Sequence, residues 1–258
     1  MKLAFSKPTR DAGAQRRLFA GYPAHGFDGL QLKNNQYGDY VAAEDGPERF
    51  RADWGDAPGH VESLITMNPL DAAGIGRLRD LVRFGAGVGA ARVVLCHDAR
   101  REGLTDADLV GFAGLLSELA QEAREQNVRL SLHHHTDQPV MHRRDFEVFF
   151  GAVRPDTLTL TVDTGHLAKS GISEVGLLIS DLAAFVDNIH LKDYADSEFR
   201  LLGRGEVDLE GALAAIVKLG DGVTLCVDEE SRAALDEGFE VSRRYLRDHG
   251  IGSPDQAE

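Results

Sequence analysis

Residue types that can bind a metal or move a proton gather at the ends of short apolar runs. The segment LSLHHHTDQPV at residues 130–140 ends one such run with three consecutive histidines. Three later runs end in Asp163, in His190 with Lys192, and in Asp228 with Glu230. From His133 onward the successive spacings are 30, 27 and 38 residues, each about one strand and one helix. Imidazoles combined with carboxylates are typical ligands of Mn²⁺, Co²⁺, Fe²⁺ or Zn²⁺, whereas Mg²⁺ prefers oxygen. The pattern therefore predicts a divalent metal site.

Side-chain alternation decides which of the three histidines can share a site. Successive residues of a β-strand point to opposite faces. In RLSLHHH at residues 129–135, His133 and His135 therefore share one face, and His134 lies on the other with two leucines. The three later runs alternate in the same way, with aliphatic residues on one face and polar residues on the other. We expect His133 and His135 to face a common interior, and His134 to be packed or hydrogen-bonded behind it.

These groups need a scaffold that brings the ends of separate strands together. Eight strand-like runs alternate with amphipathic helical patterns such as 75–88, 109–126 and 209–219, which predicts parallel strands joined by right-handed crossovers. Eight such units in 258 residues favour an α/β fold, the closed (β/α)8 TIM barrel, over an open sheet. In such barrels the site lies at the carboxyl ends of the strands. The strands are predicted at residues 2–6, 29–33, 61–67, 92–98, 129–135, 157–164, 188–194 and 223–229.

The barrel is predicted to be a single domain over residues 1–251, with a disordered tail over 252–258. No second helix is evident within residues 34–60, so we expect a long loop over the barrel mouth in its place. Trp54, the sole tryptophan, is expected on that loop, where it would cover either the site or an oligomer contact.

The charge and the cysteines narrow the choice of partners. With 28 Lys and Arg against 42 Asp and Glu, the net charge is −14, which repels nucleic acid and acidic membranes. No run approaches the roughly 20 apolar residues of a membrane span, and the N-terminal apolar stretch is too short for a signal sequence. Cys96 and Cys226 lie in apolar runs and predict no disulfide. We expect a cytoplasmic protein with a small-molecule partner; a homo-oligomer remains open.

Five motifs occur in an order that identifies a family. They are HHHTDQPV (133–140), VDTGHLAKSG (162–171), NIHLKDY (188–194), LGRGEVDL (202–209) and VDEES (227–231). With them the chain resembles the sugar phosphate isomerase/epimerase superfamily, the xylose-isomerase-like barrels, over most of its length from residue 92. The triple-histidine motif is similar to that of the inosose dehydratase members. The resemblance implies a metal-dependent isomerase, epimerase or dehydratase that acts on a keto-sugar, polyol or keto-inositol.

The resemblance also implies a set of metal ligands. The four metal positions of the family map to His133, Asp163, His190 and an acidic residue at the end of the last strand. Alternation leaves Asp228 or Glu230 for that last position, and we favour Asp228. Epimerases and isomerases of the family usually carry Glu where this chain has His133.

Further polar residues are candidates for contacts with the substrate. His166 resembles the substrate-contacting histidine of the family, with helix capping as the alternative. Lys192 can hydrogen-bond a developing enolate oxygen or a hydroxyl, or it can pair with a carboxylate such as Glu206. Gln31 and Lys33 can reach polyol hydroxyls, unless they belong to a solvated loop.

A histidine at position 133 changes the reaction that we expect. A neutral imidazole ligand cannot easily double as an acid or base, so proton transfer falls to Asp228, Glu230, His135 or His166. Two-base epimerisation becomes less favourable than one-base isomerisation or dehydration through an enediolate, with Glu230 or His135 as the base. The alternatives are a non-catalytic sugar-binding barrel and an apurinic-endonuclease-like hydrolase. Two features oppose the hydrolase. The net negative charge repels DNA, and the chain lacks the additional metal ligands that such hydrolases use.

Overall fold

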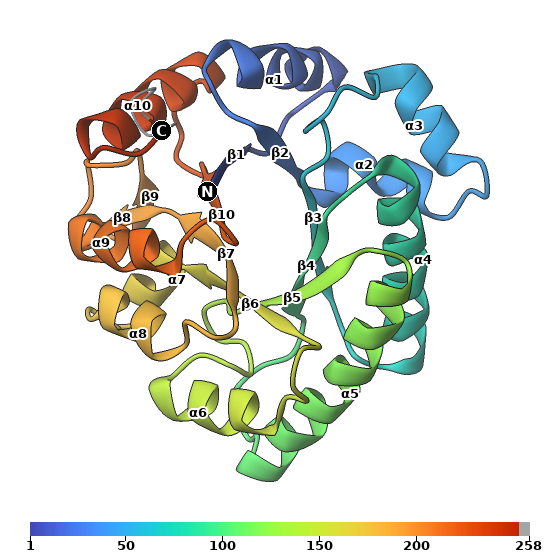
Figure 1. The fold of residues 1–258 in the computed structure, drawn as a ribbon, viewed down its shortest axis with the longest axis vertical. Helices are drawn as coiled ribbons and strands as arrows, with labels where there is room; N and C mark the ends of the chain where they lie inside the picture. The colour runs from blue at the N-terminus through green and yellow to red at the C-terminus, as the bar shows by residue number, and fades with distance from the viewer. Residues whose placement is uncertain (253–258) are drawn as a thin grey trace.

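Eight short apolar runs form parallel strands that close into a barrel, and the predicted TIM-barrel fold is confirmed (Figure 1). The structure, a computed structural model, describes residues 1–252. Around the barrel the strands follow the order in which they occur in the chain, and the last closes against the first. The barrel strands are β1 (Lys2–Ser6), β2 (Gly29–Leu32), β3 (Ser63–Asn68), β4 (Arg92–His97), β5 (Arg129–His133), β6 (Thr159–Asp163), β7 (Val186–Leu191) and β10 (Thr224–Asp228).

Helices surround the barrel and cover the aliphatic outer faces of its strands (Figure 1). The predicted helix 209–219 has the expected bounds, and those predicted from 75 and 109 begin three residues earlier. Asp71 and Thr105 immediately precede these two helices, and their side chains cap the first turn, so capping extends each helix beyond its hydrophobic pattern. The helices are α1 (Ala12–Ala24), α2 (Asn34–Val41), α3 (Gly46–Trp54), α4 (Ala72–Val88), α5 (Asp106–Glu125), α6 (Arg143–Ala152), α7 (Thr164–Lys169), α8 (Val175–Asp181), α9 (Leu209–Leu219) and α10 (Leu235–Asp248).

The prediction of a long loop over residues 34–60 is wrong, because that segment forms the two short helices α2 and α3. Trp54 is the last residue of α3 and packs on α1, with its ring stacked 5.7 Å from that of Phe19. The indole N–H donates a hydrogen bond of 2.9 Å to the hydroxyl of Tyr40. Trp54 therefore joins two helices of the outer layer instead of lying on a loop above the barrel.

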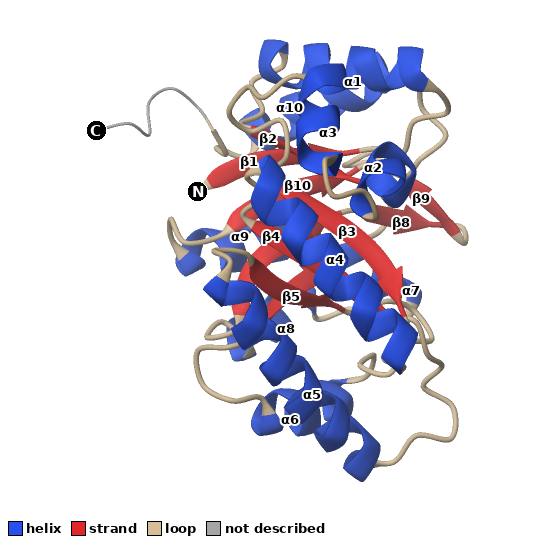
Figure 2. Cartoon of the chain, turned by 90° about the vertical axis from the view of Figure 1, so that its right-hand side faces the viewer, coloured by secondary structure: helices blue, strands red, loops and turns tan. Residues whose placement is uncertain are grey.

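A two-stranded antiparallel hairpin, β8 (Asp193–Ala195) and β9 (Glu198–Arg200), follows β7 and was not predicted. Figure 2 shows it at the end of the barrel toward which β3 points, with the N-terminus at the opposite end. Its turn places Asp196 and Ser197 at φ of 52° and 63°, which non-glycine residues seldom adopt. The hairpin extends the wall of the barrel at the carboxyl ends of the strands.

The amino-terminal end of the barrel interior is filled by a buried ion cluster. Arg92 is 1% exposed, and its guanidinium lies 2.7 Å from Glu62 and 3.3 Å from Asp187. Thr224 donates a further hydrogen bond of 3.0 Å to Glu62. Because the paired charges compensate one another, these polar groups can fill the barrel floor. The opposite, carboxyl end is left to hold the site.

Among residues 1–252, no helix is both long enough and apolar enough to cross a lipid bilayer. Apart from Gly252, the tail predicted over 252–258 lies outside the described residues.

Candidate active site

Four barrel strands carry the predicted ligands to one place at the barrel mouth. His133, Asp163 and Asp228 are the last residues of β5, β6 and β10, and His190 is the penultimate residue of β7. In the sheet register Asp163 pairs directly with His190. All four side chains are buried, with at most 2% exposure. The spacing of about one strand–helix unit thus brings these groups together.

His190 is held so that one ring nitrogen faces the carboxylates. Its Nε2–H donates a hydrogen bond of 2.8 Å to the amide oxygen of Gln31, which also accepts from the hydroxyl of Ser63 at 3.3 Å. The Nδ1 atom is buried without a hydrogen-bond partner. It lies 3.5 Å from Oδ2 of Asp163 and 3.8 Å from Oδ2 of Asp228. A buried imidazole oriented by a second residue, with its free lone pair toward carboxylates, is typical of a metal ligand.

Gln31 was predicted to reach substrate hydroxyls or to belong to a solvated loop, and the structure places it inside the barrel. The side chain is fully buried and contacts His190. It therefore orients a predicted ligand rather than lying exposed in a solvated loop.

His133 lies between Asp163 and a cysteine. Its Nε2 is 3.3 Å from Oδ2 of Asp163, and its Nδ1 is 3.4 Å from Sγ of Cys96. Burial lowers the pKa of His133 to about 4 despite the hydrogen bond to Asp163. Burial also raises the pKa of Cys96 to about 12. Both groups are therefore neutral near pH 7, and His133 has the protonation state that a metal ligand needs.

Asp163 joins the strand end to the short helix that follows. Its Oδ1 accepts the backbone N–H of His166 at 2.8 Å and caps α7. Burial alone would raise the pKa of this carboxyl, but Lys192 and the neighbouring histidines outweigh it and hold the pKa well below its usual range. Asp163 is therefore a carboxylate at neutral pH.

Two lysines neutralise the acidic residues at the end of the last strand. Nζ of Lys33 lies 2.6 Å from Asp228 and 2.8 Å from Glu230. Nζ of Lys192 lies 2.7 Å from Asp228, 2.9 Å from Glu230 and 3.2 Å from Asp163. Lys192 thus pairs with three carboxylates of the site, and its predicted alternative partner, Glu206, is not among them.

These contacts raise the pKa of the lysine Lys192 and lower the pKa values of the carboxyl groups of Asp228 and Glu230. Burial alone would lower the pKa of Lys192 and raise that of Asp228. The charges of Asp163, Asp228 and Glu230 outweigh burial at Lys192, so its pKa lies well above the usual value. The charges of Lys192 and Lys33 do the same at Asp228, whose pKa lies well below the usual value. The pKa of Glu230 is also lowered, because the two lysines outweigh both burial and the charge of Asp228. The cluster therefore consists of charged groups at neutral pH.

His135 and His166 form a pair on one side of the site. Their ring centroids are 3.9 Å apart, and Nδ1 of His166 lies 3.0 Å from the hydroxyl of Thr136. Burial lowers the pKa of His166 strongly, so this imidazole is neutral. His135 is half-buried and lines the cavity. Nδ1 of His135 donates to the backbone carbonyl of Thr136 at 3.1 Å. Nε2 of each ring is therefore the nitrogen left to bond a substrate.

His134 is buried and hydrogen-bonded at the strand end, as strand alternation predicts, although its ring also stacks on that of His133 at 5.7 Å. Its Nε2 accepts the backbone N–H of Asp163 at 2.9 Å, and its ring meets Phe146 edge-on at 5.3 Å. Burial lowers its pKa to about 3. His134 therefore supports the strand end that carries Asp163.

Within residues 1–252, two groups of residues have the geometry to hold a metal ion. One consists of His133, Asp163 and His166, and the other of Asp163, His190 and Asp228. Within each group the ligand atoms lie within 4.8 Å of one another. Because Asp163 belongs to both, the four predicted ligands surround one region of the barrel mouth.

A cavity of about 210 Å³, here called the inner cavity, opens beside these residues. The predicted groups His135, His166, Lys33, Lys192 and Glu230 all line it, together with His133 and Asp228. One wall is less polar and comes from the end of β3 and its neighbour β4. A small molecule there would have acid, base and cation-binding groups on one side.

Sequence reasoning missed three neighbours of the site. Cys96 could have been predicted, because side-chain alternation in RVVLCH at residues 92–97 directs it toward the barrel interior. Thr136 carries no motif that marks it as a partner of His166. Phe199, from the unpredicted hairpin, lies 4.5 Å from Nζ of Lys192, and no local pattern indicated this contact.

A family model described as the xylose isomerase-like TIM barrel matches residues 24–249 of the chain. The inosose dehydratase of Lacticaseibacillus casei is 26% identical over 164 residues, which cover 55% of this chain and 55% of that protein. The inosose dehydratase of Bacillus cereus strain AH820 is 28% identical over 121 residues, which cover 46% of this chain and 40% of that protein. The chain therefore spans about half the length of the curated relatives it matches.

Solved structures share the fold over nearly the whole chain. The IolI protein with a binding zinc atom has a TM-score of 0.74 at 18% identity, covering 96% of this chain and 98% of that one. A Mycobacterium smegmatis barrel in complex with magnesium has a TM-score of 0.77 at 17% identity, covering 96% of each chain. An L-ribulose 3-epimerase has a TM-score of 0.74 at 18% identity, covering 98% of this chain and 94% of that one. The family-model match over residues 24–249 confirms the family resemblance found in the motifs, and these structures share its fold.

Proposed function

Because the chain belongs to the xylose isomerase-like TIM barrel family, we propose that it is a divalent-metal-dependent enzyme that moves a proton beside the carbonyl of a keto-sugar or keto-inositol. One observation carries the proposal. Nδ1 of His190 is buried, has no hydrogen-bond partner, and faces the carboxylates of Asp163 and Asp228. Such an atom is costly to bury unless a cation or another donor reaches it.

The residues proposed to hold the cation are His133, Asp163, His190 and Asp228. Two imidazoles and two carboxylates fit Mn²⁺, Co²⁺, Fe²⁺ or Zn²⁺ better than Mg²⁺. A cation bound there would polarise the substrate carbonyl and stabilise the negative charge of an enediolate. Two structures of similar fold, one with a bound zinc atom and one in complex with magnesium, support the proposal that this barrel binds a divalent cation.

Side chains of the inner cavity supply the remaining chemistry. Glu230 or His135 takes the proton from the carbon next to the carbonyl, since both line the cavity. Lys192, Lys33 and His166 offer hydrogen bonds to the substrate oxygens. Returning that proton to the former carbonyl carbon, while a hydroxyl proton passes from the neighbouring oxygen to the former carbonyl oxygen, completes an isomerisation. Giving it instead to a β-hydroxyl, which leaves as water as the enediolate collapses, completes a dehydration. The inosose dehydratase relatives make an inosose the first substrate to test.

Solvent deuterium exchange tests the reaction whichever product is formed. An inosose and a panel of ketoses are incubated in heavy water with apo and metal-loaded protein. We expect α-hydrogen loss only with the loaded protein, and at least a hundredfold slower loss in Glu230→Gln or His135→Ala. Glu122→Gln on the outer helix α5 is the matched control and should exchange normally. Exchange at an undiminished rate in both site variants would contradict the assigned base.

A second candidate function follows from the contacts of Lys192 with three carboxylates. An ammonium in that position supports a metal-free barrel that binds a sugar without turning it over. The same panel separates the two functions. A sugar that binds without any metal-dependent exchange would favour the binding protein.

A further inference from the structure

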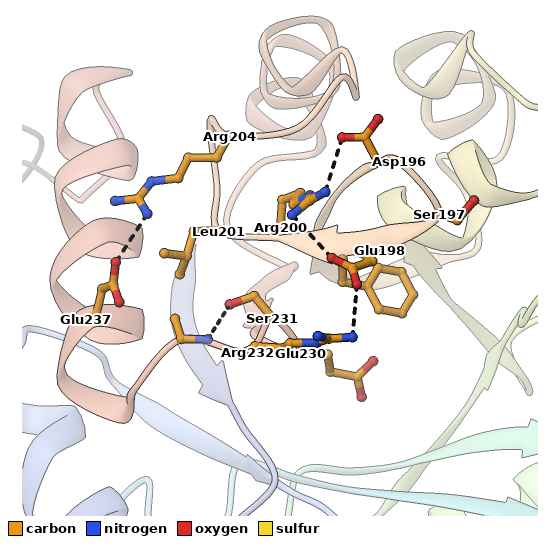
Figure 3. A pocket seen from close by; sticks show the side chains of 12 residues that line it. Asp196, Ser197, Glu198, Arg200, Leu201, Arg204, Glu230, Ser231, Arg232 and Glu237 are labelled. Atoms are coloured by element: carbon orange, nitrogen blue, oxygen red, sulfur yellow. Dashed lines mark hydrogen bonds and ion pairs between the residues drawn. The ribbon is translucent and has the colours of Figure 1, made fainter.

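A second cavity lies beside the inner one, between the β8–β9 hairpin and the segment that follows β10 (Figure 3). Its volume is about 700 Å³, and we call it the outer cavity. Glu230 lines both the inner and the outer cavity. A ligand that touches Glu230 from the inner cavity therefore has room to continue into the outer one.

The two volumes bear on the size of the substrate. Small-molecule sites in proteins usually measure about 300–1,000 Å³. The inner cavity, at about 210 Å³, falls below this range and suits a single small ring. The outer cavity, at about 700 Å³, lies within it. A monosaccharide would occupy the inner cavity and leave the larger one unused.

An aromatic ring stands where the two cavities approach each other. Phe199 of β9 lines the outer cavity, and its ring lies 5.2 Å from that of His166 and 4.5 Å from Nζ of Lys192. Tyr194 pairs with it across the hairpin and holds it in place. A flat apolar ring offers a surface on which the C–H face of a sugar can pack. This position suits the junction between two rings of one ligand.

The charges of the outer cavity decide against an anionic ligand. Arg200 lies 3.1 Å from Asp196, Arg232 lies 3.0 Å from Glu198, and Arg204 lies 3.2 Å from Glu237 (Figure 3). The lining contains three arginines but four acidic residues, because Glu230 is added to those three carboxylates. No guanidinium is left in excess to bind a phosphate or a carboxylate. Alternating N–H donors and carboxylate acceptors instead suit neutral hydroxyls.

We propose that the outer cavity is a subsite for an uncharged sugar ring, joined to the keto ring that the inner cavity holds. The inference rests on the proposed function and names its substrate class. The substrate is a glycoside of a keto-sugar or keto-inositol, rather than a free or a phosphorylated monosaccharide.

Isothermal titration calorimetry with unreactive polyols tests this assignment. The ligands are myo-inositol, its neutral galactoside galactinol, neutral disaccharides of α and β linkage, and an inositol monophosphate. We expect at least one neutral two-ring ligand to bind at least tenfold more tightly than its one-ring parent. Arg204→Ala and Phe199→Ala should remove this gain. Arg79→Ala, at an exposed arginine paired with Glu122 on the outer helices, is the matched control and should keep it.

Two results would overturn the subsite. One is equal affinity for the one-ring and all two-ring ligands, and the other is tightest binding of the phosphorylated ligand. Failure of the proposed reaction gives a different result, because deuterium exchange would then be absent while the two-ring gain persists. Thermal unfolding of Arg204→Ala and Phe199→Ala shows whether each variant is folded. Should Phe199→Ala fail to fold, the surface variant Arg204→Ala decides the matter.

Discussion

Nζ of Lys192 lies 2.7 Å from Oδ2 of Asp228 and 3.2 Å from Oδ2 of Asp163. These two carboxylates are proposed ligands of a divalent cation, and the same oxygen of each also faces Nδ1 of His190. A cation bound to both oxygens would compete with the ammonium for the same lone pairs. We therefore expect Lys192 to be displaced when the cation binds.

Replacing Lys192 with methionine should strengthen metal binding. In Lys192→Met the cation no longer competes with an ammonium, so we expect Mn²⁺ or Zn²⁺ to bind at least tenfold more tightly in calorimetry. The metal-free variant should lose about 3–5 kcal/mol of stability, because three carboxylates lose a buried partner. Added metal should recover much of this loss.

Lys33→Met is the matched control. It also removes a positive charge beside Asp228 and Glu230, but Lys33 has no ion pair with Asp163. Its gain in metal affinity should be smaller than that of Lys192→Met. If the two variants gain equally, Lys192 is only one contributor to the local charge and does not occupy the cation's place.

Gln31 should control metal affinity through His190. Its amide oxygen fixes the Nε2–H tautomer and leaves Nδ1 free. Removing such a partner typically costs ten- to a hundredfold in metal affinity. We expect Gln31→Leu to lose this much in a metal titration, whereas Gln31→Glu keeps an acceptor and should retain most of the affinity. Unchanged affinity in Gln31→Leu would show that His190 does not bind the metal.

His133 and His134 should differ in what they support. His133→Ala should lower metal affinity at least tenfold, because it removes a proposed ligand. His134→Leu should leave metal content unchanged, yet destabilise the fold by about 1–3 kcal/mol, since the buried N–H of Asp163 loses its acceptor. Elemental analysis and urea unfolding measure the two effects. Equal loss of metal in both variants would contradict the roles assigned from alternation.

The sequence predicted the parts of this molecule that follow a strict period. Alternation separated His133 from His134 because a strand has only two faces, and helix 209–219 was found from its apolar repeat. Helices α2 and α3 were missed because NNQYGDYV and GPERFRADW have few apolar residues, and their packing depends on contacts distant in sequence. The β8–β9 hairpin was missed because its turn contains no glycine.

The partners of long side chains were the least predictable feature of the site. Lys192 directly follows β7 and lines the inner cavity, on the side that alternation indicated, but alternation gives a direction and not a partner. Its ammonium reaches three carboxylates, two of them on β6 and β10. Gln31 likewise reaches across the barrel to His190, which is 159 residues away in sequence.

His97, outside the metal site, should make stability depend on pH. It ends β4, and its ring packs edge-on against Phe112 at 4.5 Å. Burial lowers its pKa from about 6.5 to about 4, despite the nearby charge of Asp98. Between these values the unfolded chain binds a proton that the folded protein excludes, so stability rises with pH across this window and is lost as pH falls through it.

The variant His97→Phe keeps an aromatic ring against Phe112 but removes the titrating group. Between pH 6.5 and pH 5 the wild type should lose about 1–2 kcal/mol more stability than His97→Phe. Urea unfolding of both proteins with a chelator present measures the difference, and the other titrating groups cancel between the two proteins. Parallel stability curves would mean that His97 takes up its proton equally in the folded and unfolded states.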